Sequence, residues 1–253
     1  RGGMTDDSAQ TAWPPSTHHA GRRGPGGGGR QRDLTVGPIG KTLIAFALPT
    51  LASNILQSLN GSINSIWVGR FLGEGALAAT SNANIIMFLM FSAVFGFGMA
   101  ATILVGQSVG RGDIEGARRA FGSSVGLVLP GAVVISVLGW VFAPAILRLL
   151  ATPGEAEAMA LIYLRVIFLG LPLSMLGVLI QMGLRGMGDS VTPLWFMGLS
   201  VAIDSSFNPL LIDGIGPFPK MGIAGSATAT LLASLVSTLG LVSYVYARDL
   251  PIR

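Results

Sequence analysis

A single acidic residue, Asp204, lies in the middle of an otherwise uncharged apolar segment, residues 191–212. A carboxylate near the centre of a bilayer costs about 3 kcal/mol unless it is paired, hydrated or protonated. Ser200 and Asn208 are four residues before and after it, so a helix places all three side chains on one face. Segments that keep such a charge typically bind a cation or a proton with it. Asp204 is therefore our main candidate for a cation-coupling residue.

Three other apolar segments carry polar side chains at helical spacing. Because amide groups that face lipid are costly, we expect these polar faces to turn toward one another. We predict that the coupling site comprises Asp204, Asn208, Asn64 and Gln57, and that Asn60, Asn84, Ser200 and Thr230 line an adjoining cavity. Thr230 belongs to a run of Ser and Thr spaced every four residues, for which helix–helix packing is the alternative interpretation.

The coupling ion stays open between H⁺ and Na⁺. A proton needs only the carboxylate, whereas Na⁺ at Asp204 would also need neutral oxygen ligands such as the amides provide. No other metal site and no cofactor is expected, because the chain has no cysteine and its two histidines, His18 and His19, precede the apolar segments. The sequence also has no HExxH motif and no phosphate-binding loop, so we expect a protein that is not an enzyme.

The composition predicts an all-α, polytopic membrane protein. Of the 253 residues, 51% are hydrophobic and only 11% are charged, against about 25% charged in soluble domains. Segments of about 20 apolar residues are long enough to cross a bilayer as helices. Six such spans are predicted, at residues 42–68, 77–105, 121–147, 158–182, 191–212 and 221–247. They would be embedded in membrane lipid.

The residues outside these spans divide the chain further. Residues 1–38 are rich in Gly and Arg, contain no apolar run, and are predicted to form a disordered tail. Pro49 precedes the first polar face by about two turns, and because a proline removes a helical hydrogen bond we predict a hinge there. The net charge of +4 comes mainly from the tail and the short loops, so it indicates membrane topology and not a nucleic-acid partner.

Lys and Arg residues concentrate on one side of the predicted spans. That side holds Arg1, Arg22, Arg23, Arg30, Arg32, Lys41, Arg111, Arg118, Arg119, Arg185, Arg248 and Arg253, and the other holds Arg70, Arg148, Arg165 and Lys220. The positive-inside rule then predicts that both termini are cytoplasmic, with the protein in the plasma (inner) membrane. Arg165 lies within the fourth span, and we expect its side chain to extend to the outer interface.

Several short strings, in order, resemble the MATE (multidrug and toxic compound extrusion) family. They are Leu48-Pro49, Ile66-Trp67-Val68-Gly69-Arg70, Tyr163-Leu164-Arg165, Leu184-Arg185-Gly186-Met187-Gly188-Asp189 with Thr192-Pro193, and Asn208-Pro209-Leu210-Leu211-Ile212. The resemblance implies a secondary antiporter that exports organic cations or drugs in exchange for H⁺ or Na⁺. It also implies a fold of twelve helices in two lobes, of which residues 39–248 match the N-terminal lobe. Residues 249–253 would then begin the inter-lobe linker, and the missing C-terminal lobe would be a partner.

The chain departs from the family pattern at the predicted coupling site. The family commonly has an Asp at the position of Asn64, and an Asn followed four residues later by an Asp at the positions of Asp204 and Asn208. The fifth-span pair is therefore reversed here, and Asp204 is left as the only carboxylate for coupling. A non-transporting membrane module and a lipid-linked sugar flippase remain alternatives. The predicted passage lacks the several basic residues that a flippase would need for a pyrophosphate.

Overall fold

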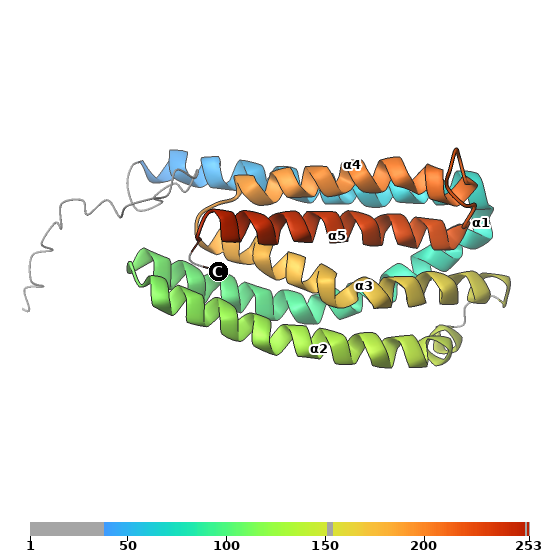
Figure 1. Ribbon diagram of the computed structural model, residues 1–253, viewed down its shortest axis with the longest axis horizontal. Coiled ribbons are helices and arrows are strands. Elements are labelled where there is room, and N and C mark those ends of the chain that lie inside the picture. The colour runs from blue at the N-terminus through green and yellow to red at the C-terminus, as the bar shows by residue number, and fades with distance from the viewer. Residues whose placement is uncertain (1–37, 151–153, 251, 253) are drawn as a thin grey trace, which may run out of the picture.

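The structure is a computed structural model, which describes residues 38–150, 154–250 and 252. These residues form five helices and no strand: α1 (Ile39–Gly110), α2 (Ile114–Leu149), α3 (Gly154–Gly186), α4 (Val191–Asp213) and α5 (Ile223–Ala247). All of them run roughly along the long axis of one bundle (Figure 1). The all-α prediction is confirmed. The predicted tail lies outside the described residues except for Pro38, and the linker boundary at residue 249 stays a prediction.

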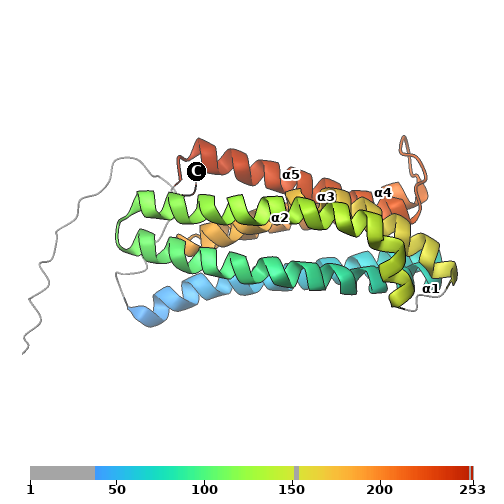
Figure 2. The same cartoon turned by 90° about the horizontal axis from the view of Figure 1, so that it is seen from below.

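Helix α1 contains the first two predicted spans. It is 72 residues long, about 108 Å at 1.5 Å per residue, far more than the roughly 30 Å of a bilayer core. Its backbone leaves the helical region at Gly73, where φ is 83° and ψ is −173°, and the chain reverses there (Figures 1 and 2). Gly73 lies between the first two predicted spans, 42–68 and 77–105, a few residues after the Gly69-Arg70 pair. Only glycine readily adopts the conformation found at Gly73, so that residue sets the reversal.

All five helices are long and apolar enough to cross a membrane. With α1 counted as two arms, residues 39–72 and 74–110, the bundle supplies the six predicted passes. Most helices extend beyond the predicted apolar spans; α2, for example, begins at Ile114 and not at residue 121. The additional turns at the start of α2 contain Glu115, Arg118 and Arg119, so an apolar window does not detect them.

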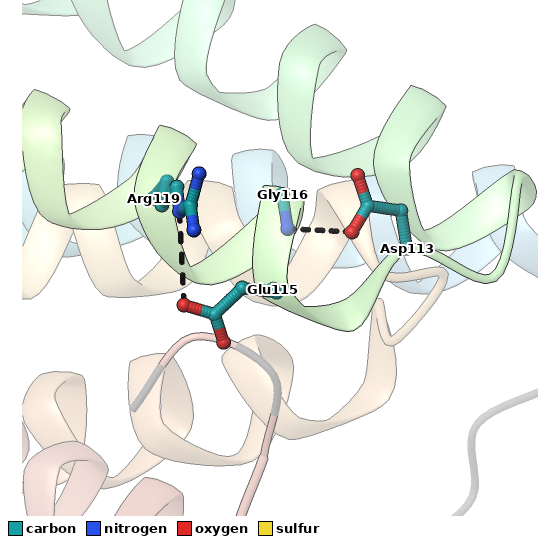
Figure 3. Close-up of polar contacts among 4 residues, drawn as sticks. All are labelled: Asp113, Glu115, Gly116 and Arg119. Carbon is teal, nitrogen blue, oxygen red and sulfur yellow. Dashed lines mark hydrogen bonds and ion pairs between the residues drawn. The ribbon is translucent and has the colours of Figure 1, made fainter.

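The start of α2 shows how such a turn is stabilised (Figure 3). The Asp113 carboxylate accepts a hydrogen bond from the Gly116 backbone N–H at 2.8 Å, which satisfies one of the free donors at the helix N-terminus. One turn later, Arg119 Nε lies 3.7 Å from Glu115 Oε1. Both groups are exposed, and the pair adds only a few tenths of a kcal/mol. The cap therefore determines where α2 begins.

Helix α3 supplies much of the core. It packs against α1, α2 and α5, and its fully buried side chains are Tyr163, Leu164, Phe168, Leu171, Met175, Leu179 and Leu184. The side chains that α2 exposes are, in contrast, mostly large and apolar, among them Val133, Leu138 and Phe142. A span with this distribution faces lipid on one side and protein on the other. Around the α3 core, α4, α5 and the first arm of α1 are placed side by side.

The helix continues through Pro49, the predicted hinge. Two hydroxyl groups donate to carbonyls in this region, Thr50 Oγ1 to Phe46 at 3.1 Å and Ser53 Oγ to Pro49 at 2.9 Å. Such hydrogen bonds, from a side-chain hydroxyl to the backbone carbonyl four residues earlier, often bend a helix. Whether Pro49 acts as a hinge stays a prediction.

We expect Gly73→Ala to lower the free energy of unfolding by about 1–3 kcal/mol, because alanine is strained in this backbone conformation. A Cβ at Gly73 would contact nothing within 4 Å, so the loss comes from the backbone alone. Thermal unfolding of the detergent-purified chain, followed by circular dichroism, measures it. Gly96→Ala is the matched control, since Gly96 is helical and equally uncrowded. Equal stability of the two variants would contradict the assignment.

Candidate functional site: a polar ladder between three passes

Asp204 is buried within α4, with 2% of its surface exposed. Its Oδ2 accepts a hydrogen bond from Asn60 Nδ2 at 2.9 Å, and its Oδ1 accepts one from Thr230 Oγ1 at 3.1 Å. These donors come from the first arm of α1 and from α5. The carboxylate therefore connects three passes, and each of its oxygens has one protein donor.

A second set of hydrogen bonds joins the same passes one turn further along. Asn64 Oδ1 accepts from Asn208 Nδ2 at 3.1 Å and from Ser226 Oγ at 2.8 Å. Asn208 is 1% exposed and Ser226 is fully buried. The Asn64 amide oxygen is therefore the acceptor of both hydrogen bonds.

The two sets have the same register. Asn60 pairs with Asp204 and Asn64 with Asn208, and both pairs are separated by 144 residues in the sequence. Both helices advance one turn between the pairs, so the first arm of α1 and α4 run parallel here. We call this arrangement the polar ladder; it consists of Asn60, Asn64, Asp204, Asn208, Ser226 and Thr230.

Local contacts at its two ends set the rotation and spacing of α4. At the N-terminus, Asp189 accepts from the backbone N–H groups of Val191 at 3.1 Å and Thr192 at 3.0 Å, which fixes the first turn. At the other end, a Cβ on Gly225 would lie 2.4 Å from the Leu211 carbonyl oxygen. Only glycine permits this approach of α5 to α4. The next residue, Ser226, is thereby brought to Asn64.

The ladder leaves buried oxygen atoms unpaired. A carboxylate only accepts hydrogen bonds, so Asn60 must present its NH₂ group to Asp204. Its Oδ1 is then buried and has no hydrogen-bond partner among the described residues, and the same is true of Asn208 Oδ1 and Ser205 Oγ. Buried polar atoms without a partner are rare in native proteins and require an explanation. A bound cation is one.

Tyr163, on α3, is a member of the site that the polar patterns did not predict. Its phenol is buried and lies near Asn64 and Asp204. The residues three and four positions before and after it are apolar, so no polar stripe marked this position. Ser226 was also not among the predicted site residues. It lies in the Ser and Thr run, which packing alone would explain.

Three predicted residues lie off the ladder. Gln57 and Asn84 are exposed on the two arms of α1, and Ser200 is half-buried on α4, one turn before Asp204. Among the described residues, no hydrogen bond joins any of them to the ladder. Gln57 precedes Asn60 by less than one turn, yet its side chain is exposed. Its coupling role, like the cavity-lining roles of Asn84 and Ser200, stays a prediction.

Comparison with protein families gives a match to the MatE family model over residues 49–210. The sequence is 35% identical over 213 residues to the probable multidrug resistance protein YoeA of Bacillus subtilis, covering 84% of this chain and 46% of that protein. It is 32% identical over 212 residues to the FAD transporter of Shewanella oneidensis, covering 84% of this chain and 46% of that protein. The chain thus spans about half the length of these relatives.

Solved structures give the same result for the fold. An outward-facing multidrug resistance MATE family transporter of the MOP superfamily superposes with a TM-score of 0.77 at 25% identity. The match covers 84% of this chain and 46% of that one. The polar ladder therefore lies within a bundle that corresponds to about half of such a transporter.

We expect Ser226→Ala to destabilise the protein by about 0.6 kcal/mol, the average for a hydrogen bond between membrane helices. The variant removes a donor to Asn64 from a fully buried position. Thermal unfolding of the purified chain provides the measurement, with Ser234→Ala on the same Ser and Thr run as the control. Ser234 makes no hydrogen bond with another pass among the described residues. A larger loss in the control would show that the ladder does not hold α5.

Proposed function

The chain belongs to the MatE family, whose members are membrane transporters and not enzymes, and we propose that it forms one half of a secondary antiporter. The complete transporter would export small organic cations or drugs in exchange for H⁺ or Na⁺. The observation that carries this proposal is the buried Asp204 carboxylate, held between three passes by neutral donors. Its partners compensate the charge by hydrogen bonds but do not neutralise it.

Coupling would follow from the state of this carboxylate. An ionised Asp204 in a low-dielectric site favours entry of a cation, and neutralisation changes which packing of α1, α4 and α5 is most stable. The cation bound on one side of the membrane would then leave on the other as the substrate crosses. One charge that moves through 100 mV supplies about 2.3 kcal/mol. For an uncharged substrate, that energy is sufficient to drive an uphill export of about fiftyfold.

The unpaired oxygens of the ladder favour Na⁺ over H⁺ as the coupling ion. Asn60 Oδ1 and Asn208 Oδ1 belong to the side chains that surround Asp204, and both are buried without a partner among the described residues. A hard cation binds to carboxylate and carbonyl oxygens, whereas a proton would leave these two atoms unsatisfied. Among the described residues, no three or more His, Cys, Asp or Glu lie together in a way that could hold a metal ion. This fits a monovalent ion with a single carboxylate ligand.

The substrate passage is proposed to follow the exposed polar side chains of α1. Asn54, Gln57 and Ser58 are exposed on its first arm, and Asn84 on its second. Amide groups are costly in lipid, so this face is expected to meet water or protein. The other half of the transporter would cover it, and the substrate would cross between the halves.

The arrangement in the cell follows from the charges of the loops. We propose a multi-pass protein of the plasma (inner) membrane with both termini in the cytoplasm, because Lys and Arg concentrate at that end of the passes. The described lobe offers no basic cluster along the α1 passage face, which counts against a sugar flippase. A non-transporting module is the other alternative, and the experiments below separate it from an antiporter.

We expect Asp204→Asn, in the complete transporter that contains this chain, to abolish dye efflux driven by an imposed cation gradient. The amide keeps the size of the side chain but cannot exchange a charge, so the site no longer couples. Efflux of a cationic fluorescent dye from membrane vesicles provides the measurement. The control is Asp213→Asn, because Asp213 is partly exposed and pairs with Lys220 at 3.1 Å at the end of α4. Undiminished efflux by Asp204→Asn would refute the coupling role.

For the ion, we expect an inward Na⁺ gradient at constant pH to drive efflux, and Asn208→Ala to raise the Na⁺ concentration for half-maximal rate about tenfold. The expected change corresponds to the loss of one neutral ligand, about 1.4 kcal/mol. The same vesicles are then tested with a pH gradient in the absence of Na⁺. If efflux follows that pH gradient and ignores Na⁺, the proton is the coupling ion. A transporter that responds to neither gradient would support the non-transporting alternative.

A further inference from the structure

Arg165 is a charged residue of α3 whose partner is an aromatic ring. Its guanidinium carbon lies 4.8 Å from the centre of the Trp140 ring on α2. Its Nε–H is enclosed and has no hydrogen-bond acceptor, and no carboxylate among the described residues forms an ion pair with it. The ring covers one face of the guanidinium in a cation–π contact. The positive charge itself is left without an anion.

This pair lies on a surface that faces lipid. On α3, Ile162 and Leu169 are 47% and 74% exposed and lie about one turn on either side of Arg165, on the same face. On α2, Trp140 is 44% exposed, and the adjacent Val137 and Val141 are 58% and 56% exposed. Large apolar side chains exposed on membrane-spanning helices contact acyl chains. Arg165 is partly exposed on this apolar surface.

The passage lies elsewhere on the bundle. Gln57 and its exposed polar neighbours are on the first arm of α1, whereas α2 runs along the opposite edge (Figure 1). Between residues 125 and 147, every exposed side chain of α2 is apolar. The Arg165–Trp140 pair is on α2 and α3, which carry none of the exposed polar side chains of the proposed passage, and it has lipid as its neighbour.

The depth of Arg165 suits the phosphate level of a bilayer. Helix α3 has 33 residues, about 50 Å, which exceeds the hydrocarbon core by about 20 Å. If the excess is shared between the two ends, each end extends about 10 Å beyond the core. Arg165 comes about 16 Å after the start of α3, so it is only about 6 Å inside the core boundary. An arginine side chain can cover that distance and reach the headgroups.

We propose that Arg165 and Trp140 form a binding site for the phosphate group of a phospholipid. The phospholipid belongs to the leaflet at the α2–α3 connection. The planar guanidinium presents paired N–H donors that match two phosphate oxygens, and the Trp140 ring holds that plane in place. Tryptophan is itself enriched at the headgroup level, where its ring is apolar and its N–H is polar. The acyl chains of the lipid would lie on the exposed side chains of α2 and α3.

The test is native mass spectrometry of the purified chain titrated with phosphatidylglycerol and, separately, with diacylglycerol, which has the same acyl chains and no phosphate. Arg165→Gln is expected to weaken binding of the first phosphatidylglycerol about tenfold, the effect of a hydrogen bond to a charged group. Binding of diacylglycerol is expected to be unchanged. Arg165→Lys, which keeps the charge but loses the paired donors, is expected to give an intermediate value.

Arg148→Gln is the matched control. Arg148 is at the same end of α2, is exposed, and already pairs with Glu157 at 3.4 Å. If Arg165→Gln binds phosphatidylglycerol as the unmodified protein does, or if Arg148→Gln weakens it equally, the site is refuted. Displacement of the lipid by excess inorganic phosphate would also overturn the proposal, because it would show a site for free anions. Circular dichroism of each variant verifies the fold, and Arg165→Lys, the least disruptive change, still decides the result if Arg165→Gln does not fold.

Discussion

The polar groups of this bundle must find partners within the protein, because the surrounding lipid offers none. Asp204 is the most demanding of them, since among the described residues it is the only buried carboxylate within a helix. Its two oxygens take donors from two different helices. The first arm of α1, α4 and α5 therefore have one arrangement in which the charge is compensated. The register of Asn64 with Asn208 and Ser226 follows from that arrangement, because helices that are aligned at one turn are also aligned at the next.

The same hydrogen bonds connect the helices and form the candidate binding site. Packing and function were alternative interpretations of the Ser and Thr run. Thr230 and Ser226 from that run both belong to the ladder. Hydrogen bonds between membrane helices are individually weak, on average about 0.6 kcal/mol. A cation that coordinates Asp204 and the unpaired amide oxygens can thus compete with them at moderate cost. A site that is proposed to bind and release an ion once per cycle benefits from ligands that are already held but not fully satisfied.

Asp204 was predictable because one charge within an apolar segment is a strong signal, and the faces of α1, α4 and α5 followed from helical spacing. Other features were not. The reversal of α1 occurs at Gly73, and the sequence around it contains Gly69 and Gly75 as equally plausible break points. Tyr163 has an amphipathic side chain that is common in apolar cores, so its polar end gave no signal. Gln57 shares a helix with Asn60 and Asn64, but spacing alone does not say where a protein face ends and an exposed face begins.

The sequence by itself determined that the chain is an all-α membrane protein, how many passes it has, and which residues have to avoid lipid. These properties depend on local composition and on the 3.6-residue period, which any helix obeys. Only the tertiary structure decided which polar faces meet, that Asn60 and not Gln57 binds Asp204, and that Asn64 serves as an acceptor in place of an acid. These pairings depend on the close approach of α5 to α4 at Gly225 and on the rotation of α4 set by Asp189. Neither contact is made by a ladder residue itself, and no local pattern records them.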